Sequence, residues 1–314
     1  MPVMSLTSHY IDIEGVNIHY VSAEPYLDKK ANSNNKPTLV FLHGFPEYWQ
    51  AWQHQLSYFS DNYRVIAPDL PGYNLSDKPD DISFYQVPNL INFFSKFIAA
   101  VSQNQKVLLV AHDWGGAIAW PLAAFYSQYI DKLVILNAAH PSTFTREMIN
   151  NPLQRNKSDY IHQLINLNAE DLLQANNYQY LCEKMLFADG SAVLNADTKA
   201  NYIAAWQQTG VINGMLQYYR AMPQLAAKSD EKANQQVKHV SEMKIPNIRV
   251  NVPTLILWGE QDEAFVVENL NNLEQYVPNC TIKRFKDASH WLMHEKSAQI
   301  NIAIENFINT SVVS

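Results

Sequence analysis

The segment LLVAHDWGGAIAW at residues 108–120 restricts the fold more than any other part of the sequence. A short apolar run typical of a buried strand ends in a sharp turn, and a helical pattern follows at once. Asp113 stands at the apex of this turn, with Ala111 before it and Gly115 and Gly116 after it. Larger side chains at those positions would collide in so tight a turn. The segment therefore predicts a strand-to-helix elbow that presents Asp113, although aspartate is also favoured as the N-terminal cap of a helix.

Strand and helix patterns alternate along much of the chain. After a hairpin at residues 10–21, strands are predicted at residues 38–42, 63–67, 107–111, 133–136, 254–258 and 281–285. Helices are predicted at residues 90–101, 115–129, 267–276 and from about residue 295. Continuous apolar runs that alternate with helices are typical of strands buried on both faces. The pattern predicts an α/β fold with a mostly parallel sheet covered by helices on both faces.

The alternation stops between residues 141 and 244, where helical patterns dominate. These patterns occur at residues 160–167, 171–187, 199–207 and 215–221, and a polar stretch follows at residues 228–238. We interpret residues 141–244 as a helical cap inserted into the α/β core. The core then comprises residues 1–140 and 245–314.

Glycine is rare in this chain, with nine in 314 residues, and its positions are informative. Five glycines come directly after predicted strands or at the first turn beyond them, namely Gly44, Gly72, Gly115, Gly116 and Gly259. Ligand sites of open parallel sheets lie beyond the carboxyl ends of the strands. One loop glycine carries little information, but five at one sheet edge indicate unusual backbone angles or close packing at a site.

Two titratable residues follow the last strands of the predicted sheet. Asp262 comes just after the strand at residues 254–258, and His290 comes just after the strand at residues 281–285. The chain order nucleophile, acid, histidine, with Asp113 first, matches that of hydrolases built on a strand-to-helix elbow. Among ten histidines, His290 is chosen because it stands at a strand end in this order. We predict Asp113 as nucleophile, Asp262 as acid and His290 as base.

The loop HGFPEYW at residues 43–49 follows the first central strand. Such a loop can direct a backbone N–H toward the elbow, and the helix start at Trp114 offers a second one. We therefore predict an oxyanion hole formed by the backbone N–H groups of Phe45 and Trp114.

An aspartate nucleophile narrows the chemistry. Attack on an acyl carbonyl would give a reactive anhydride, whereas attack on a saturated carbon that bears a leaving group gives an alkyl ester. Water activated by His290, with Asp262 orienting the imidazole, would then hydrolyse that ester at Asp113. Epoxide oxygens and halides are leaving groups of this kind. His294 lies one helical turn beyond His290, but the sequence is not H-E-x-x-H, so no zinc site is predicted. We expect the reaction to need no metal or organic cofactor.

The motifs HGFPEYW, AHDWGG, LILWGEQD and SHWLMHE together resemble those of the epoxide hydrolases, in the aspartate-nucleophile branch of the α/β-hydrolase superfamily. The resemblance covers essentially the whole chain and implies an α/β-hydrolase core, a helical cap, and the opening of an epoxide to a vicinal diol. It also implies two cap tyrosines that donate protons to the epoxide oxygen, Tyr160 in DYIHQL and Tyr219 in GMLQYYRAMP. Trp114, Phe45 and Pro46 are the substrate-binding residues that it implies.

Several positions depart from the pattern of that family. Leu164 stands where an aromatic residue is usual, and Tyr218 competes with Tyr219 for the second donor position. The loop at residues 69–74 lacks an arginine and a second glycine, and Ala111 replaces a glycine. Neither the changes in the loop at residues 69–74 nor Ala111 replaces a catalytic group.

Two other functions remain open. A haloalkane or haloacid dehalogenase shares the fold, the aspartate nucleophile and the histidine–acid pair, and Trp114 could donate an N–H to a halide. However, Phe45 stands where haloalkane dehalogenases often have asparagine, and Trp114 stands where haloacetate dehalogenases have arginine. The other function is that of a small-molecule receptor that retains the hydrolase fold without catalysis. The loss of a catalytic residue would favour it, but Asp113, Asp262 and His290 are all present.

Charge and composition bear on the partners. The formal net charge of −7 provides no basic surface for nucleic acid. The apolar runs are far shorter than the roughly 20 residues that span a bilayer, and no secretory signal is visible. The two cysteines, Cys182 and Cys280, fit a reducing compartment. We expect a cytoplasmic protein, monomeric or homodimeric, that acts on a small molecule and binds neither nucleic acid nor membrane.

Overall fold

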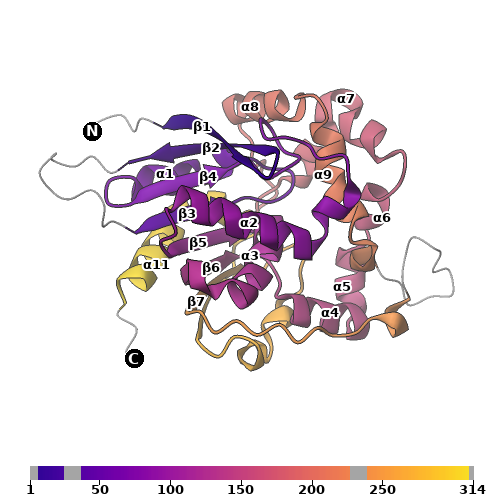
Figure 1. Ribbon diagram of the computed structural model, residues 1–314. Helices are drawn as coiled ribbons and strands as arrows, with labels where there is room; N and C mark the ends of the chain where they lie inside the picture. The colour runs from indigo at the N-terminus through magenta and orange to yellow at the C-terminus, as the bar shows by residue number, and fades with distance from the viewer. Residues whose placement is uncertain (1–5, 25–36, 227–238, 311–314) are drawn as a thin grey trace, which may run out of the picture.

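The computed structural model describes residues 6–24, 37–226 and 239–310. In these ranges eight strands form one sheet in the order β1-β2-β4-β3-β5-β6-β7-β8 (Figure 1). The strands are β1 (Thr7–Ile13), β2 (Val16–Ala23), β3 (Thr38–Leu42), β4 (Arg64–Pro68), β5 (Val107–His112), β6 (Ile130–Leu136), β7 (Thr254–Gly259) and β8 (Cys280–Phe285). Strands β3 to β8 pair in parallel, whereas β2 is antiparallel to β1 and β4. The predicted hairpin and mostly parallel sheet are confirmed.

Helices cover both faces of the sheet, because successive residues of a buried strand point to opposite faces. On β3, Val40 and Leu42 pack into the core beneath α2 and α3, whereas Leu39 and Phe41 pack into the core beneath α1 and α11. These four helices are α1 (Gln53–Phe59), α2 (Val87–Val101), α3 (Trp114–Phe125) and α11 (Ser297–Asn309). Among the described residues, no helix is long and apolar enough to cross a membrane.

Between β6 and β7 the described residues form six α-helices, in the segment that the sequence predicts as an insertion. They are α4 (Pro141–Asn150), α5 (Pro152–Lys157), α6 (Ile161–Leu164), α7 (Ala169–Lys184), α8 (Ala196–Trp206) and α9 (Val211–Arg220). Trp206 Nε1–H donates to the Pro46 carbonyl at 2.7 Å, and the Tyr218 hydroxyl donates to the Pro71 carbonyl at 2.9 Å. Helices α8 and α9 are thereby bonded to the loops that follow β3 and β4, beside the sheet (Figure 1). The polar stretch predicted at residues 228–238 lies outside the described residues.

Two predicted helices are broken in the structure by residues with left-handed backbone angles. The helix predicted at residues 267–276 is wrong, because Asn272 has a left-handed φ of 55° that a right-handed helix cannot include. The segment forms two short 3₁₀ helices, η7 (Val267–Leu270) and η8 (Leu273–Gln275). The helix predicted at residues 171–187 is interrupted in α7, where Asn176 has a φ of 50°. Asparagine adopts left-handed angles more readily than most residues, which explains why both breaks fall there.

Candidate active site

Asp113 occupies the turn between β5 and α3, where the sequence predicts the elbow. Its backbone φ of 48° and ψ of −118° are strained for a residue with a side chain. The carboxylate does not cap α3, and its Oδ1 atom instead accepts the Phe45 backbone N–H at 2.7 Å. The interpretation of Asp113 as a helix cap is therefore wrong. Trp114 begins α3, so its N–H is one of the free donors at the start of that helix.

Glycines surround the elbow because neighbouring chain segments approach it closely. A Cβ atom on Gly44 would lie 2.3 Å from Asp113 Oδ1, and a Cβ atom on Gly115 would lie 2.3 Å from the Leu42 carbonyl oxygen. Both distances are far below van der Waals contact, so a larger residue would displace its neighbours. Close packing, which the sequence indicated, explains both glycines.

His290 and Asp262 lie beside Asp113, although each follows a different strand. His290 Nδ1 is 2.8 Å from Asp262 Oδ2. His290 Nε2 lies 3.7 Å from Asp113 Oδ2. The Phe45 N–H binds the other carboxylate oxygen, Oδ1. The structure thus brings together the three residues that the sequence placed at separate strand ends.

Several donors hold Asp262 in place. Its Oδ1 atom accepts the backbone N–H groups of Ala264 at 2.6 Å and Phe265 at 3.0 Å. Its Oδ2 atom also accepts the Asn137 side-chain amide, and Asn137 in turn accepts the Gly259 N–H at 2.8 Å. Sequence reasoning missed Asn137, although its position directly after β6 puts it at the same edge of the sheet as the other site residues.

Neighbouring carboxylates set the charge of His290. Burial lowers the pKa of His290, but the negative charges of Asp262, Asp113 and Glu47 outweigh burial and raise this pKa to about 9. Burial raises the pKa of Asp262, and the interactions with His290 bring it below its ordinary value. With its pKa raised in this way, His290 is cationic at neutral pH.

Glu47 is a buried carboxylate in the loop at residues 43–49 that sequence reasoning did not single out. It lies 2.6 Å from His294 Nε2, accepts the Tyr202 hydroxyl at 3.0 Å, and lies 3.5 Å from His112 Nδ1. Burial raises the pKa of Glu47, but the two histidines hold it well below its ordinary value.

In the part of the chain that the structure describes, no group of three or more His, Cys, Asp or Glu residues could hold a metal ion.

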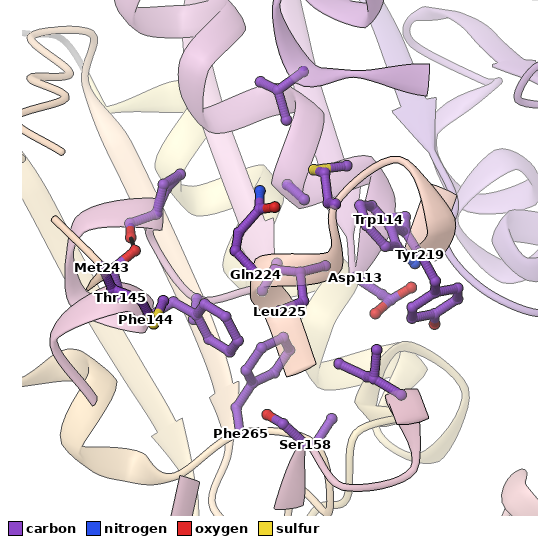
Figure 2. Close-up of a pocket in the computed structure, with 18 of the residues that line it drawn as sticks. Asp113, Trp114, Phe144, Thr145, Ser158, Tyr219, Gln224, Leu225, Met243 and Phe265 are labelled. Atoms are coloured by element: carbon purple, nitrogen blue, oxygen red, sulfur yellow. Dashed lines mark hydrogen bonds between the residues drawn. The ribbon is translucent and has the colours of Figure 1, made fainter. Parts of the chain in front are cut away.

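Tyr160 and Tyr219 lie in front of Asp113, on the side of the inserted helices. Tyr160 directly precedes α6 and Tyr219 lies on α9, with their ring centroids 6.3 Å apart. Figure 2 shows the Tyr219 ring beside Asp113. Burial raises the pKa of both hydroxyls, and the charge of Asp113 raises it further, so both stay protonated at neutral pH. The competing Tyr218 instead donates its hydroxyl to a backbone carbonyl in the loop after β4.

Two cavities meet at Asp113. One has a volume of about 240 Å³ and mainly apolar walls (Figure 2), and the other, of about 490 Å³, contains most of the polar side chains and His290. The residues that line both cavities are Asp113, Tyr160, Tyr219 and Ala264. The predicted substrate-binding residues divide between them, with Trp114 in the smaller cavity and Phe45 and Pro46 in the larger.

The chain is similar to known proteins over nearly its whole length. The family model described as "alpha/beta hydrolase fold" matches residues 37–297. Epoxide hydrolase 1 of Caenorhabditis elegans is 32% identical over 312 residues, which cover 96% of this chain and 70% of that protein. Epoxide hydrolase 4 of Homo sapiens is 32% identical over 317 residues, which cover 97% of this chain and 80% of that protein. The crystal structure of an epoxide hydrolase from Bacillus megaterium in complex with an inhibitor matches with a TM-score of 0.81 and 33% identity, covering 96% of this chain and 100% of that one.

Proposed function

The chain belongs to the epoxide hydrolase family of the α/β-hydrolase superfamily, and on that premise we propose that it opens an epoxide to a vicinal diol through a covalent ester on Asp113. One observation carries this proposal. The Asp113 carboxylate sits at a strained elbow with one oxygen bound by a backbone N–H and the other facing a histidine. We divide the chain into a core of residues 1–140 and 245–314 and a cap of residues 141–244.

In the first step, Asp113 Oδ2 attacks a carbon of the oxirane ring. The ring carbon–oxygen bond breaks as the ester bond forms, and the departing oxygen takes a proton from the paired hydroxyls of Tyr160 and Tyr219. Without this proton the leaving group would be an alkoxide, and positioned proton donors typically accelerate such steps by about 10²–10⁴-fold. The products of the step are the hydroxyalkyl ester and a tyrosinate.

In the second step, water attacks the Asp113 ester carbon while His290 Nε2 takes its proton. Negative charge develops on Asp113 Oδ1, where the N–H groups of Phe45 and Trp114 stabilise it. When the tetrahedral intermediate collapses, the bond to the diol oxygen breaks and His290 returns the proton to that oxygen. Asp113 is left with one oxygen from water, and the diol carries the former Oδ2.

The two tyrosines distinguish this site from the alternatives. An epoxide oxygen must be protonated as it leaves, whereas a halide leaves as a stable anion, so a dehalogenase needs no such pair of hydroxyls. A receptor would gain nothing from a histidine held between an acid and a nucleophile. Tyr160 and Tyr219 therefore favour an epoxide over a haloalkane.

A single turnover in ¹⁸O-labelled water tests the covalent step. With enzyme in excess over styrene oxide, the first diol should carry no label, because its new oxygen comes from Asp113. The label should appear in the peptide that contains Asp113, and parallel assays with haloalkanes should release no chloride or bromide. Label in the first diol would refute the covalent route, and halide release without diol formation would identify a dehalogenase.

We expect ester hydrolysis to slow as the pH falls. In the resting enzyme the pKa of His290 is about 9, so it is protonated at neutral pH. Esterification removes the negative charge of Asp113, which lowers this pKa and lets His290 give its proton to the tyrosinate and then act as a base. The hydrolysis rate should therefore rise with pH to a plateau, with an apparent pKa below 9. Rapid-quench measurement of ester decay would show this, and an apparent pKa at or above that of the resting enzyme would contradict it.

Gly44→Ala should impair catalysis, because the added methyl group must displace either the Asp113 carboxylate or the Phe45 N–H that binds it. Loss of one such donor lowers kcat by about a hundredfold or more. Steady-state kinetics measure the loss, and thermal unfolding shows whether the variant folds. Gly190→Ala is the control for backbone strain alone: its φ of 81° disfavours alanine and should lower stability, but nothing lies within 4 Å of a Cβ atom there, so kcat should stay unchanged. A folded Gly44→Ala variant with unchanged kcat would count against the packing argument.

A further inference from the structure

The two cavities that meet at Asp113 differ in polarity. We propose that the preferred epoxide carries one aromatic or alkyl substituent, up to about the size of a naphthyl group, and on its other side only hydrogen or a neutral hydrogen-bonding arm. The apolar substituent binds in the cavity of about 240 Å³ and the polar arm in that of about 490 Å³. This inference rests on the proposed function, because it concerns the substrate of the same site.

The smaller cavity provides an apolar environment. Its walls include Phe144 and Phe265, whose rings lie edge to face with centroids 5.9 Å apart, and the side chain of Leu225 (Figure 2). Met222 also lines this cavity. All of its described lining residues are buried or half-buried, and among them Asp113 carries the only charge. A substituent placed here is stabilised in proportion to the apolar area that it removes from water.

The volume of this cavity limits the size of the substituent. A protein cavity of about 150 Å³ with apolar walls holds one benzene molecule. At about 240 Å³, the smaller cavity has room for a two-ring aromatic group or a medium-length alkyl chain, and not for three fused rings.

The larger cavity has mixed walls that are more polar than those of the smaller one, and it reaches the surface. Besides Asp113 and His290, its charged lining residues are two lysines and two acids, Lys157, Lys184, Asp159 and Glu263. Three of these four are exposed, which places them at the opening. Gln163 also lines this cavity, and its side-chain oxygen accepts the Tyr180 hydroxyl at 3.2 Å. Because both signs of charge are present in equal number, these walls suit a neutral hydrogen-bonding group better than a single charge.

An apolar arm in the larger cavity would be unfavourable in two ways. It would cover the polar side chains without replacing the hydrogen bonds that water gives them. It would also lie beside His290, which lines the larger cavity and not the smaller one, without offering a hydrogen bond to the water that hydrolyses the ester, whereas a hydroxyl arm of the same size offers one. Water for ester hydrolysis therefore reaches His290 through the larger cavity, which also holds the polar arm.

Two matched substrates test this arrangement. In trans-3-phenylglycidol the phenyl-bearing oxirane carries a hydroxymethyl arm, and in trans-β-ethylstyrene oxide an ethyl arm of nearly the same shape replaces it. We expect kcat/KM to be about tenfold higher for the hydroxymethyl substrate. The carboxylate analogue, phenylglycidate, should react no faster than phenylglycidol. Across monosubstituted oxiranes, kcat/KM should rise from methyl to phenyl to naphthyl and fall at anthracenyl.

Two glutamine variants locate the polar arm. Gln163→Leu removes an amide from the larger cavity and should lower the hydroxymethyl-to-ethyl ratio by about threefold. Gln224→Leu removes an amide from the smaller cavity and should leave the ratio unchanged, which makes it the matched control. Using a ratio cancels the differences in folding and expression between the variants.

Each contrary outcome overturns a defined part of the proposal. Equal kcat/KM for the two arms, or a preference for ethyl or carboxylate, would refute the polar assignment while diol formation still supports epoxide hydrolysis. A ratio that Gln163→Leu leaves unchanged, or that Gln224→Leu lowers, would refute the placement of the arm. Faster turnover of the anthracenyl oxirane than the naphthyl one would refute the size limit. If no epoxide yields a diol, the proposed function itself fails.

Discussion

Replacing His290 with glutamine should leave the enzyme able to form the ester on Asp113 and unable to hydrolyse it at a useful rate. Ester formation needs only the carboxylate and the tyrosine hydroxyls, whereas hydrolysis needs a base, and the side chain of glutamine is not one. Turnover should fall by about a thousandfold or more, since a positioned base contributes up to about 10⁴-fold. Mass spectrometry of the intact variant should show a stable increase equal to the mass of the epoxide.

Two control variants make this result specific to the site. Asp113→Asn in the same background should abolish the added mass, because the amide is a poor nucleophile. His9→Gln alters a histidine bonded to Ser22 at the sheet edge and should leave turnover unchanged. A His290→Gln variant that retains full turnover, or that loses turnover without accumulating an adduct, would refute the assignment of His290 as the base.

Changing Tyr160 and Tyr219 together to phenylalanine should suppress ester formation. Each ring would keep its packing, but the departing oxygen would lose both proton donors. We expect the alkylation rate in single turnover to fall by roughly 10²-fold or more, with ester decay affected less. Equal slowing of both steps would contradict the role as proton donors.

Tyr218→Phe is the matched control for this pair. The Tyr218 hydroxyl is buried against a backbone carbonyl and lies on the same helix as Tyr219. Its removal should lower the free energy of unfolding by about 1 kcal/mol through the lost hydrogen bond. The alkylation rate should stay close to that of the wild type, and a loss as large as that of the double variant would mean that the tyrosines act mainly through the fold.

The core of the fold and the predicted catalytic residues could be derived from the sequence because their signals are local. Parallel strands end at one edge of the sheet, so Asp113, Asp262 and His290 were expected to meet once each was placed after a strand. The elbow was visible in its small neighbours, and Gly44 and Gly115 do pack against other chain segments there. These inferences needed no knowledge of side-chain positions.

Contacts between distant segments could not be derived in this way. Glu47 meets Tyr202 and His294, which lie 155 and 247 positions away, and no sequence rule pairs them. The two cavities are equally hidden, because their walls come from the core and the inserted helices together. The break at Asn272 was missed because an asparagine within a helical pattern is not by itself a stop signal, and only its left-handed φ makes it one.

The bonds from α8 to the loop at residues 43–49 have a consequence for protein engineering. Trp206 donates to the Pro46 carbonyl, and Tyr202 donates to Glu47, so one helix of the insertion steadies the loop that also supplies an N–H donor to the nucleophile. Grafting the insertion of a relative onto this core, a natural way to alter substrate preference, would sever both bonds unless the incoming helix preserved them. A successful chimera must therefore transplant the loop and the helix as one unit.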